Sequence, residues 1–227
     1  MNPFFTLTAT LLFSLASLCA ETIKVACVGD SITWGARIKK RETNCYPAQL
    51  QKLLGKPYEV RNFGVSGSTL LTKGNKPYIR QNFYKQALAC KPDIVIIKLG
   101  TNDCKGINWK RSEAFVEDYK NLVESFKNLE SKPSIWLCLP VHSFRDLSKY
   151  PPNQVAKHIS QANIEEAIPK IKTVATDMSL EIIDLHSLLT KKKFYNPDEI
   201  HPNKEGATLI AKKIAETIQA SQKSASK

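Results

Sequence analysis

The residues best placed to do chemistry lie near the two ends of the chain. Ser31 follows the apolar run at 23–29 after a single residue, Asp30, so it is either the start of a short helix or a nucleophile. A serine nucleophile needs a neighbouring base at neutral pH. Of the four histidines, His201 fits best, because Asp198 three residues earlier can hold its Nδ1 and leave Nε2 for the serine. This combination predicts acyl transfer.

Acyl transfer also needs hydrogen-bond donors for the oxyanion of the tetrahedral intermediate. Three candidates are the backbone N–H of Ser31, the backbone N–H of Gly67 and the side-chain amide of Asn102. Glycine suits a loop where the backbone approaches a substrate closely, and an asparagine amide offers two donors without a charge. The competing interpretation of Asn102 is that the Asn-Asp pair caps a helix.

A regular scaffold must position these residues, and the hydrophobic pattern predicts one. Five apolar runs rich in Val, Ile and Leu predict strands buried on both faces, as in a parallel sheet: 23–29, 58–64, 93–100, 134–140 and 180–186. Helical patterns alternate with them, near 46–54, 79–89, 112–129, 154–176 and 203–220. Pro169 is expected to kink or break the fourth helix.

Strict alternation of strands and helices predicts a doubly wound α/β fold with right-handed crossovers. In such folds the ligand site lies beyond the carboxyl ends of the strands. Ser31, Gly67 and Asn102 each follow a predicted strand, so they should meet at one edge of the sheet. This convergence favours a functional site over unrelated turns and caps.

Four segments carry a family resemblance. GDSIT at 29–33, NFGVSGST at 62–69, GTND at 100–103 and DEIHPN at 198–203 resemble, in this order, the four sequence blocks of the SGNH hydrolases, also called the GDSL esterase/lipase family. The resemblance implies an α/β, three-layer α/β/α, flavodoxin-like fold with a five-stranded parallel sheet, here over residues 21–220.

The resemblance also implies roles for the site residues. Ser31 would be the nucleophile, His201 the base and Asp198 its orienting carboxylate, with Gly67 and Asn102 as oxyanion donors beside the Ser31 N–H. It implies no metal and no cofactor. The sequence looks most similar to the secreted bacterial sialate O-acetylesterases and carbohydrate acetylesterases, so the expected substrate is an O-acyl ester of a small sugar or a polysaccharide.

Further residues are candidates for holding the sugar. All of them lie in loops or at strand ends near the expected rim of the site. The candidates are Asp30, Trp34, Tyr78, Trp109, His142 and Phe144. Arg37, Arg41 and Arg145 are candidate partners of a sugar carboxylate. Core packing is the more common role of such aromatic rings. For each of these residues a structural role is an open alternative.

The chain ends differ in composition from the middle. Residues 1–20 carry no charged side chain and end in small residues, which predicts a signal peptide and a secreted or periplasmic protein without stable membrane insertion. Residues 221–227 are polar and predict a disordered tail. In an oxidising compartment Cys45 and Cys104, both in loops near the site, could form a disulfide.

The net charge of +12 is compatible with an anionic partner. Its lysines and arginines are scattered, however, and export also disfavours a nucleic-acid partner. Two other functions stay open. One is a lysophospholipase or thioesterase of the same family, which would need an apolar acyl tunnel. The other is a non-catalytic module that binds an acidic glycan.

Overall fold

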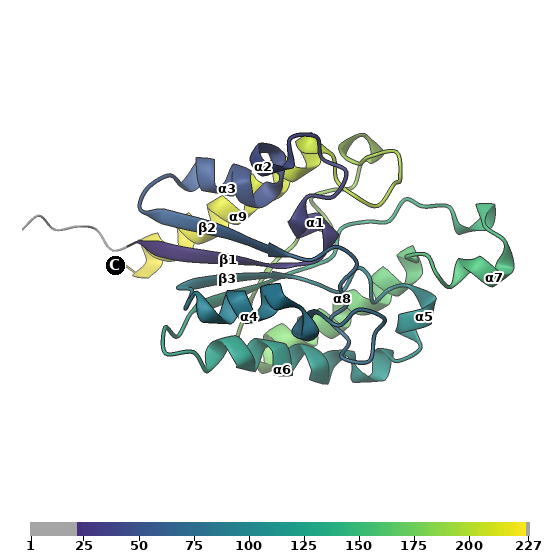
Figure 1. Ribbon diagram of the computed structural model, residues 1–227, viewed down its shortest axis with the longest axis horizontal. Coiled ribbons are helices and arrows are strands. Elements are labelled where there is room, and N and C mark those ends of the chain that lie inside the picture. The colour runs from purple at the N-terminus through teal and green to yellow at the C-terminus, as the bar shows by residue number, and fades with distance from the viewer. Residues whose placement is uncertain (1–21, 226–227) are drawn as a thin grey trace, which may run out of the picture.

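The computed structural model describes residues 22–225, with one parallel sheet at its centre (Figure 1). The strand order is β2-β1-β3-β4-β5, the order of flavodoxin-like folds, and every neighbouring pair is parallel. The strands are β1 (Ile23–Gly29), β2 (Tyr58–Gly64), β3 (Ile94–Lys98), β4 (Ser134–Cys138) and β5 (Glu181–Ile183). The expected α/β fold with a five-stranded sheet is confirmed.

Helices cover both faces of the sheet and complete three layers (Figure 1). The longer helices are α3 (Tyr46–Leu54), α4 (Asn82–Ala89), α6 (Phe115–Lys127), α8 (Gln161–Asp177) and α9 (Lys204–Ala225). Short helices α1 (Ser31–Trp34), α2 (Arg41–Asn44), α5 (Gly106–Trp109) and α7 (Pro152–Val155) lie in the connections. In Figure 1, α3 and α9 lie on one side of the sheet and α4, α6 and α8 on the other.

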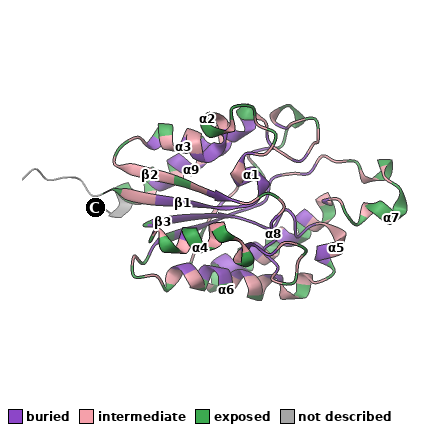
Figure 2. Ribbon diagram, in the orientation of Figure 1, coloured by how far each residue is buried: buried purple, intermediate pink, exposed green. Residues whose placement is uncertain are grey.

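Strand β1 shows how the sequence builds two cores. Its side chains alternate between the faces: Ala26 and Val28 join the cluster under α4, α6 and α8, whereas Val25 and Cys27 join the cluster under α3 and α9. All four are fully buried, which explains the unbroken apolar run in the sequence. Figure 2 shows the central strands buried and the outer faces of the helices exposed.

The structure corrects three expectations about the helices. The expected fourth helix is split into α7 and α8, and α8 continues through Pro169 without ending. His158, expected within that helix, lies instead in the bend between the two. Helix α9 continues to Ala225, so most of the expected disordered tail at 221–227 is helical. The expected signal peptide lies outside the described residues.

The expected disulfide is absent, because Cys45 and Cys104 are both free thiols. Cys45 precedes α3, and its Sγ lies 3.7 Å from Asn62 Nδ2. Cys104 belongs to the cluster on the opposite face of the sheet, and its Sγ lies 3.2 Å from the Gly100 carbonyl oxygen. The two loops share an edge of the sheet, but the Cys104 side chain packs in the layer opposite the one that α3 covers.

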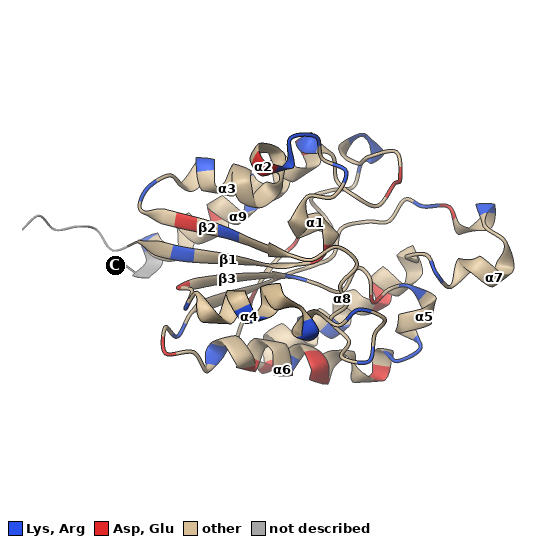
Figure 3. Cartoon of the chain, viewed as in Figure 1, with Lys and Arg blue, Asp and Glu red and all other residues tan. Residues whose placement is uncertain are grey.

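Lysine and arginine residues are distributed over the helices and loops of both outer layers rather than in one region (Figure 3). This distribution agrees with a solvated basic surface more than with a single anion-binding face. Within residues 22–225, none of the helices combines the length and apolar character needed to cross a membrane.

Candidate active site

Ser31 is the first residue of α1, directly beyond the carboxyl end of β1. The Asp30 side chain caps this short helix by accepting a hydrogen bond from the Ile32 N–H at 2.9 Å. Glycine is required at position 29, because a Cβ there would lie 2.1 Å from Thr33 Oγ1 and 2.7 Å from the Lys98 carbonyl oxygen. Close packing of the turn therefore fixes where the serine stands.

Asp30, expected near the substrate, is fully buried beneath Ser31. Its carboxylate pairs with the equally buried Lys98, whose Nζ lies 3.1 Å from Oδ2 and also donates to Thr101 Oγ1. The structure therefore gives Asp30 a supporting place instead of a substrate contact. Sequence reasoning missed Lys98, although a lysine inside the apolar strand 94–98 was a visible signal.

His201 and Asp198 lie in the loop before α9 and complete a hydrogen-bond chain to the serine. His201 Nε2 is 2.8 Å from Ser31 Oγ, and His201 Nδ1 is 2.6 Å from Asp198 Oδ2. Asp198 Oδ1 accepts the backbone N–H groups of Ile200 and His201 at 3.2 and 3.0 Å. This is the geometry that a serine needs for activation by a histidine base.

The environment keeps Asp198 ionised. Burial works to raise its pKa, but the hydrogen bonds from the His201 ring and from the His201 and Ile200 N–H groups outweigh burial, so the pKa lies below its ordinary value. Arg37 Nε adds an ion pair at 2.6 Å to Oδ2, the oxygen that also faces His201. Arg145 Nη2 donates to the Asp198 carbonyl oxygen at 3.0 Å and so steadies the loop.

Gly67 and Asn102 lie beside Ser31 in the lining of one pocket. Gly67 has φ of +82°, a conformation that favours glycine, while a Cβ there would meet only Lys76 Cδ at 3.7 Å. Asn102 Nδ2 donates to the Ser68 carbonyl oxygen at 3.1 Å, which leaves its second amide hydrogen available. Among residues 22–225, the N–H groups of Ser31 and Gly67 find no protein acceptor.

Asp103 explains the shape of the loop that carries Gly67. It is fully buried and accepts the Leu70 and Leu71 N–H groups at 2.9 and 2.8 Å. Burial raises the pKa of this carboxyl to about 6. The Asn-Asp pair therefore ties two strand-end loops together instead of capping a helix.

The pocket over Ser31 encloses about 380 Å³. Besides the residues described above, its lining comprises Ala36, Ser66, Lys105, Lys157, Ile159 and Ile200. None of these six was singled out from the sequence: Ser66 and Ile200 fall inside two of the four family segments, and the other four lie in connections without a motif. Lys105 is half-buried, and burial lowers its pKa below the ordinary lysine value.

Of the nine expected sugar-binding side chains, only those of Arg37 and Arg145 line this pocket. Tyr78 is fully buried and its hydroxyl donates to the Phe63 carbonyl oxygen at 2.7 Å. Trp109 is also buried, and its Nε1 donates to Glu166 at 2.7 Å. These two rings pack in the core, and the sequence could not separate them from rim residues because all of them lie in connections between the predicted strands and longer helices.

His142 and Phe144 lie outside the pocket lining as well. The His142 ring stacks on His186 with 3.7 Å between centroids, and its Nδ1 lies 3.2 Å from Gln161 Nε2. Burial, followed by the neighbouring His186, lowers the pKa of His142. Phe144 packs edge-on against Tyr195 at 5.1 Å.

Trp34 and Arg41 lie just beyond the catalytic pocket. Arg41 stacks its guanidinium carbon 3.7 Å from the Trp34 ring centroid, and Trp34 lines a neighbouring hollow. Within residues 22–225, no group of three His, Cys, Asp or Glu side chains is arranged to hold a metal ion.

Comparisons with known proteins identify relatives of this chain. An acetylxylan esterase of Xylanibacter ruminicola is 38% identical over 218 residues, which cover 88% of this chain and 44% of that protein, so the chain spans less than half of this relative. A carbohydrate acetylesterase from Sinorhizobium meliloti has a TM-score of 0.71 at 21% identity, with 88% of this chain and 99% of the other covered. The M. smegmatis aryl esterase has a TM-score of 0.70 at 21% identity and the same coverage.

These solved structures show a shared fold. The family itself is shown by a family model, described as the GDSL-like lipase/acylhydrolase family, which matches residues 27–209. That range contains Ser31, Gly67, Asn102 and the Asp198–His201 pair, the residues that the fold brings to one edge of the sheet. The chain belongs to the GDSL-like lipase/acylhydrolase family.

Proposed function

We propose that this protein is a serine esterase that removes acetyl groups from carbohydrate through an acyl-enzyme on Ser31. The observation that carries the proposal is the continuous chain of hydrogen bonds from Ser31 Oγ through His201 to Asp198, at 2.8 and 2.6 Å. The acetylxylan esterase of Xylanibacter ruminicola, 38% identical, supports carbohydrate acetate as the substrate class.

The mechanism follows from which atoms face the serine. His201 Nε2 takes the proton of Ser31 Oγ as this oxygen attacks the ester carbonyl carbon. The N–H groups of Ser31 and Gly67 and the Asn102 amide then face the negative oxygen of the tetrahedral intermediate. Collapse breaks the ester C–O bond, and His201 returns its proton to the leaving sugar hydroxyl.

Deacylation repeats these steps with water. His201 takes a proton from the water that attacks the acetyl carbonyl, and the same three donors stabilise the second intermediate. Loss of Ser31 Oγ as the leaving group releases acetate, and His201 reprotonates the serine. Asp198 stays ionised throughout and stabilises the imidazolium, in agreement with its lowered pKa.

The pocket favours one finer possibility, an acidic sugar such as an O-acetylated sialic or uronic acid. Four basic side chains line it, namely Arg37, Lys105, Arg145 and Lys157. The single carboxylate in the lining, Asp198, is already engaged by His201 and Arg37. A substrate carboxylate would complement this excess of positive charge. A higher kcat/KM on acetylated acidic sugars than on matched neutral ones would support this possibility.

The first test measures hydrolysis of p-nitrophenyl acetate, butyrate and octanoate by the wild type and by Ser31→Ala. A rate that depends on Ser31 and falls with chain length supports an acetylesterase. A rate that rises with chain length indicates a lysophospholipase or thioesterase instead. If no ester is hydrolysed in a Ser31-dependent way, a glycan-binding module without turnover becomes the better explanation.

Export is part of the proposal and depends on the composition of residues 1–20 alone. An extracellular polysaccharide would be out of reach of an enzyme that stays in the cytoplasm. Fractionation of cells expressing the full chain, with N-terminal sequencing of the product, tests it. Recovery in the cytoplasm with an intact N-terminus would contradict export.

A further inference from the structure

A second hollow adjoins the catalytic pocket and has no part in the mechanism above. It encloses about 480 Å³ and is lined by Trp34, Gly64, Val65, Ser66, Gln81, Asn82 and Phe83. Ser66 lines both hollows, so they share a wall. A ligand anchored over Ser31 could therefore extend directly into this second hollow.

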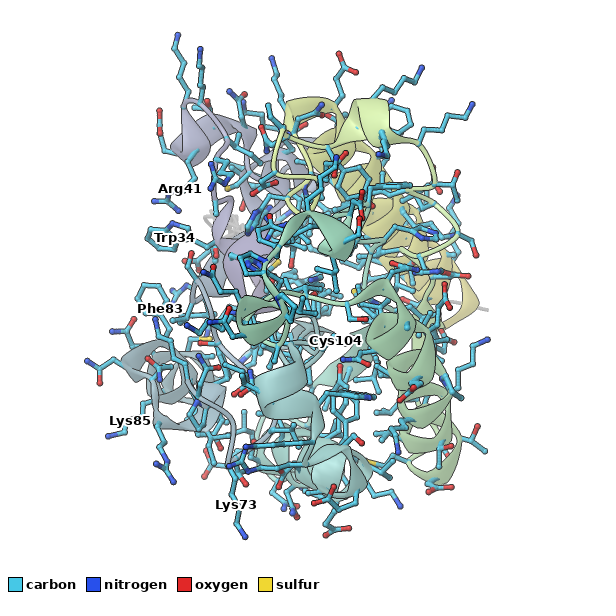
Figure 4. All side chains as sticks on the ribbon, turned by 90° about the vertical axis from the view of Figure 1, so that its right-hand side faces the viewer. Trp34, Arg41, Lys73, Phe83, Lys85 and Cys104 are labelled. Atoms are coloured by element: carbon cyan, nitrogen blue, oxygen red, sulfur yellow. The ribbon has the colours of Figure 1, made fainter. Side chains whose placement is uncertain are left out.

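Two aromatic rings form its main surface. Trp34 comes from α1, three residues after Ser31, and Phe83 comes from α4, with ring centroids 6.2 Å apart and planes inclined by 37°. Both side chains are only partly buried, unlike the core rings Tyr78 and Trp109. Figure 4 shows Arg41, Trp34 and Phe83 one above another along one side of the molecule.

Arg41 holds the indole ring and the backbone of Trp34, and Asn62 holds the backbone. The Arg41 guanidinium lies over the ring at 3.7 Å, and its Nη1 donates to the Trp34 carbonyl oxygen at 3.2 Å. Asn62 Nδ2 donates to the same carbonyl oxygen at 3.4 Å and to that of Thr33 at 2.8 Å. A ring held this way loses little conformational freedom when a ligand stacks on it.

The rest of the lining is uncharged and includes three polar side chains, Ser66, Gln81 and Asn82. Gln81 and Asn82 place two side-chain amides at the hollow, and Gln81 Nε2 already donates to the Pro77 carbonyl oxygen at 2.9 Å, which leaves its amide oxygen available. Val65 is the one aliphatic side chain in the lining. Aromatic faces pack against the C–H faces of a sugar ring, and amides bind its hydroxyls, whereas a fatty acyl chain would suit aliphatic walls better.

We propose that this hollow is a subsite for a neighbouring sugar ring of the same glycan chain whose acetyl group lies over Ser31. The inference rests on the proposed esterase function and adds that the substrate is an oligosaccharide or a polysaccharide. A monosaccharide acetate would occupy the catalytic pocket and leave the second hollow unused. The enzyme should therefore act faster on acetylated xylan than on acetylated xylose at equal acetate concentration.

The experiment compares Phe83→Ala and Trp34→Ala with wild type on acetylated xylan and on p-nitrophenyl acetate. Loss of an aromatic contact predicts about a three- to tenfold lower kcat/KM on xylan for each variant. Phe83 lies away from the catalytic residues, so Phe83→Ala should leave hydrolysis of p-nitrophenyl acetate unchanged. Tyr58→Ala, which truncates another partly buried aromatic residue at the opposite edge of the sheet, is the matched control and should leave both rates unchanged.

Sugar binding is measured separately from hydrolysis, so that failure of the esterase proposal can be distinguished from failure of the subsite proposal. Titrating Ser31→Ala with unacetylated xylohexaose should change the tryptophan fluorescence saturably, because Trp34 is more exposed than the buried Trp109 and Trp136. Binding without turnover by the wild type would overturn the esterase function and keep the sugar subsite. Equal xylan rates in wild type and Phe83→Ala, with no xylohexaose binding, would overturn the subsite. A loss in Phe83→Ala confined to p-nitrophenyl octanoate would instead make it an acyl-chain pocket.

Discussion

Two charged clusters flank Ser31, and they differ in burial. Beneath the serine, Asp30 and Lys98 form an ion pair in which neither side chain is exposed. Above it, Asp198 pairs with His201 and with Arg37, whose side chains are 9%, 19% and 63% exposed. The lower pair is closed to water and to substrate, whereas the upper cluster opens into the catalytic pocket.

We therefore expect the buried pair to support the fold and the open cluster to take part in the proposed reaction. A buried ion pair must satisfy all its groups internally, and here Asp30 also accepts the Ile32 N–H while Lys98 also donates to Thr101. Removing one partner should therefore harm folding. In the open cluster, water can replace a lost partner of Asp198, so changes there should act on the rate more than on stability.

The largest expected effect is on the rate. His201→Ala should lower kcat by about 10⁴- to 10⁶-fold, because the serine loses its base. The free energy of unfolding should change by less than about 1 kcal/mol, since the ring lies in the open cluster. Steady-state kinetics and urea unfolding check this, with His186→Ala as the control. A variant that keeps a tenth of the wild-type rate would remove His201 from the mechanism.

Asp198→Asn should lower kcat by about 10⁴-fold, because an amide cannot stabilise the imidazolium as a carboxylate does. The amide oxygen can still accept the His201 and Ile200 N–H groups, so the loop should keep its shape. Kinetics on p-nitrophenyl acetate with a thermal unfolding curve measure both. A rate close to that of wild type would mean that His201 needs no carboxylate partner.

Lys98→Met should destabilise the protein by about 3–5 kcal/mol, because it leaves the Asp30 carboxylate buried and unpaired. Urea unfolding measures the loss. Lys120→Met is the matched control, since Lys120 pairs with Asp177 at 2.7 Å on the surface and should cost less than about 1 kcal/mol. Equal losses of unfolding free energy in the two variants would show that burial of the Asp30–Lys98 pair does not increase its contribution to stability.

Arg37→Ala should cost less than about 1 kcal/mol of stability despite its short ion pair with Asp198, because the arginine is mostly exposed. Arg61→Ala, which breaks the exposed pair with Glu59 away from the site, serves for comparison. Chemical denaturation of both variants should give similar small changes. A loss of several kcal/mol in Arg37→Ala alone would place Arg37 with the buried cluster.

The smallest expected effect is on how the free energy of unfolding depends on pH. The pKa of Asp198 is lower in the folded protein than its ordinary value of 3.8, so its stabilising contribution is present above pH 3.8 and is lost as the pH falls through the folded pKa. Wild type should therefore lose more stability than Asp198→Asn when acidified below about pH 4. Parallel acid dependence of the two unfolding free energies would contradict this.

Helix α3 and the Asp198–His201 contact involve residues close together in the sequence and could be predicted, whereas the contact between the distant residues Asp30 and Lys98 could not. Helix α3 occupies the predicted residues 46–54, since its apolar spacing is a local pattern. The Asp198–His201 contact spans three residues and was predictable from spacing. The Asp30–Lys98 pair joins positions 68 residues apart, and sequence reasoning placed Asp30 in a different role.

The aromatic residues show the same limit. Trp34, Tyr78 and Trp109 all lie in short helical segments that connect strands to longer helices, yet Tyr78 and Trp109 are buried and Trp34 lines a hollow. No local pattern distinguishes these outcomes, because each depends on which helix packs over the loop. The Cys45–Cys104 pairing was wrong for the same reason, because each thiol contacts a different partner, Asn62 for Cys45 and the Gly100 carbonyl oxygen for Cys104.

By itself, the sequence determined the alternation of strands and helices and the four segments that carry Ser31, Gly67, Asn102 and the Asp198–His201 pair. Backbone hydrogen bonding and the spacing of apolar residues involve only a few neighbouring positions, so a short stretch of sequence determines these features. The tertiary structure alone decided which charges are buried together, which rings face a hollow and which basic residues surround the serine. These depend on contacts between distant segments, and the free energy of each contact is set by burial that no short stretch of sequence defines.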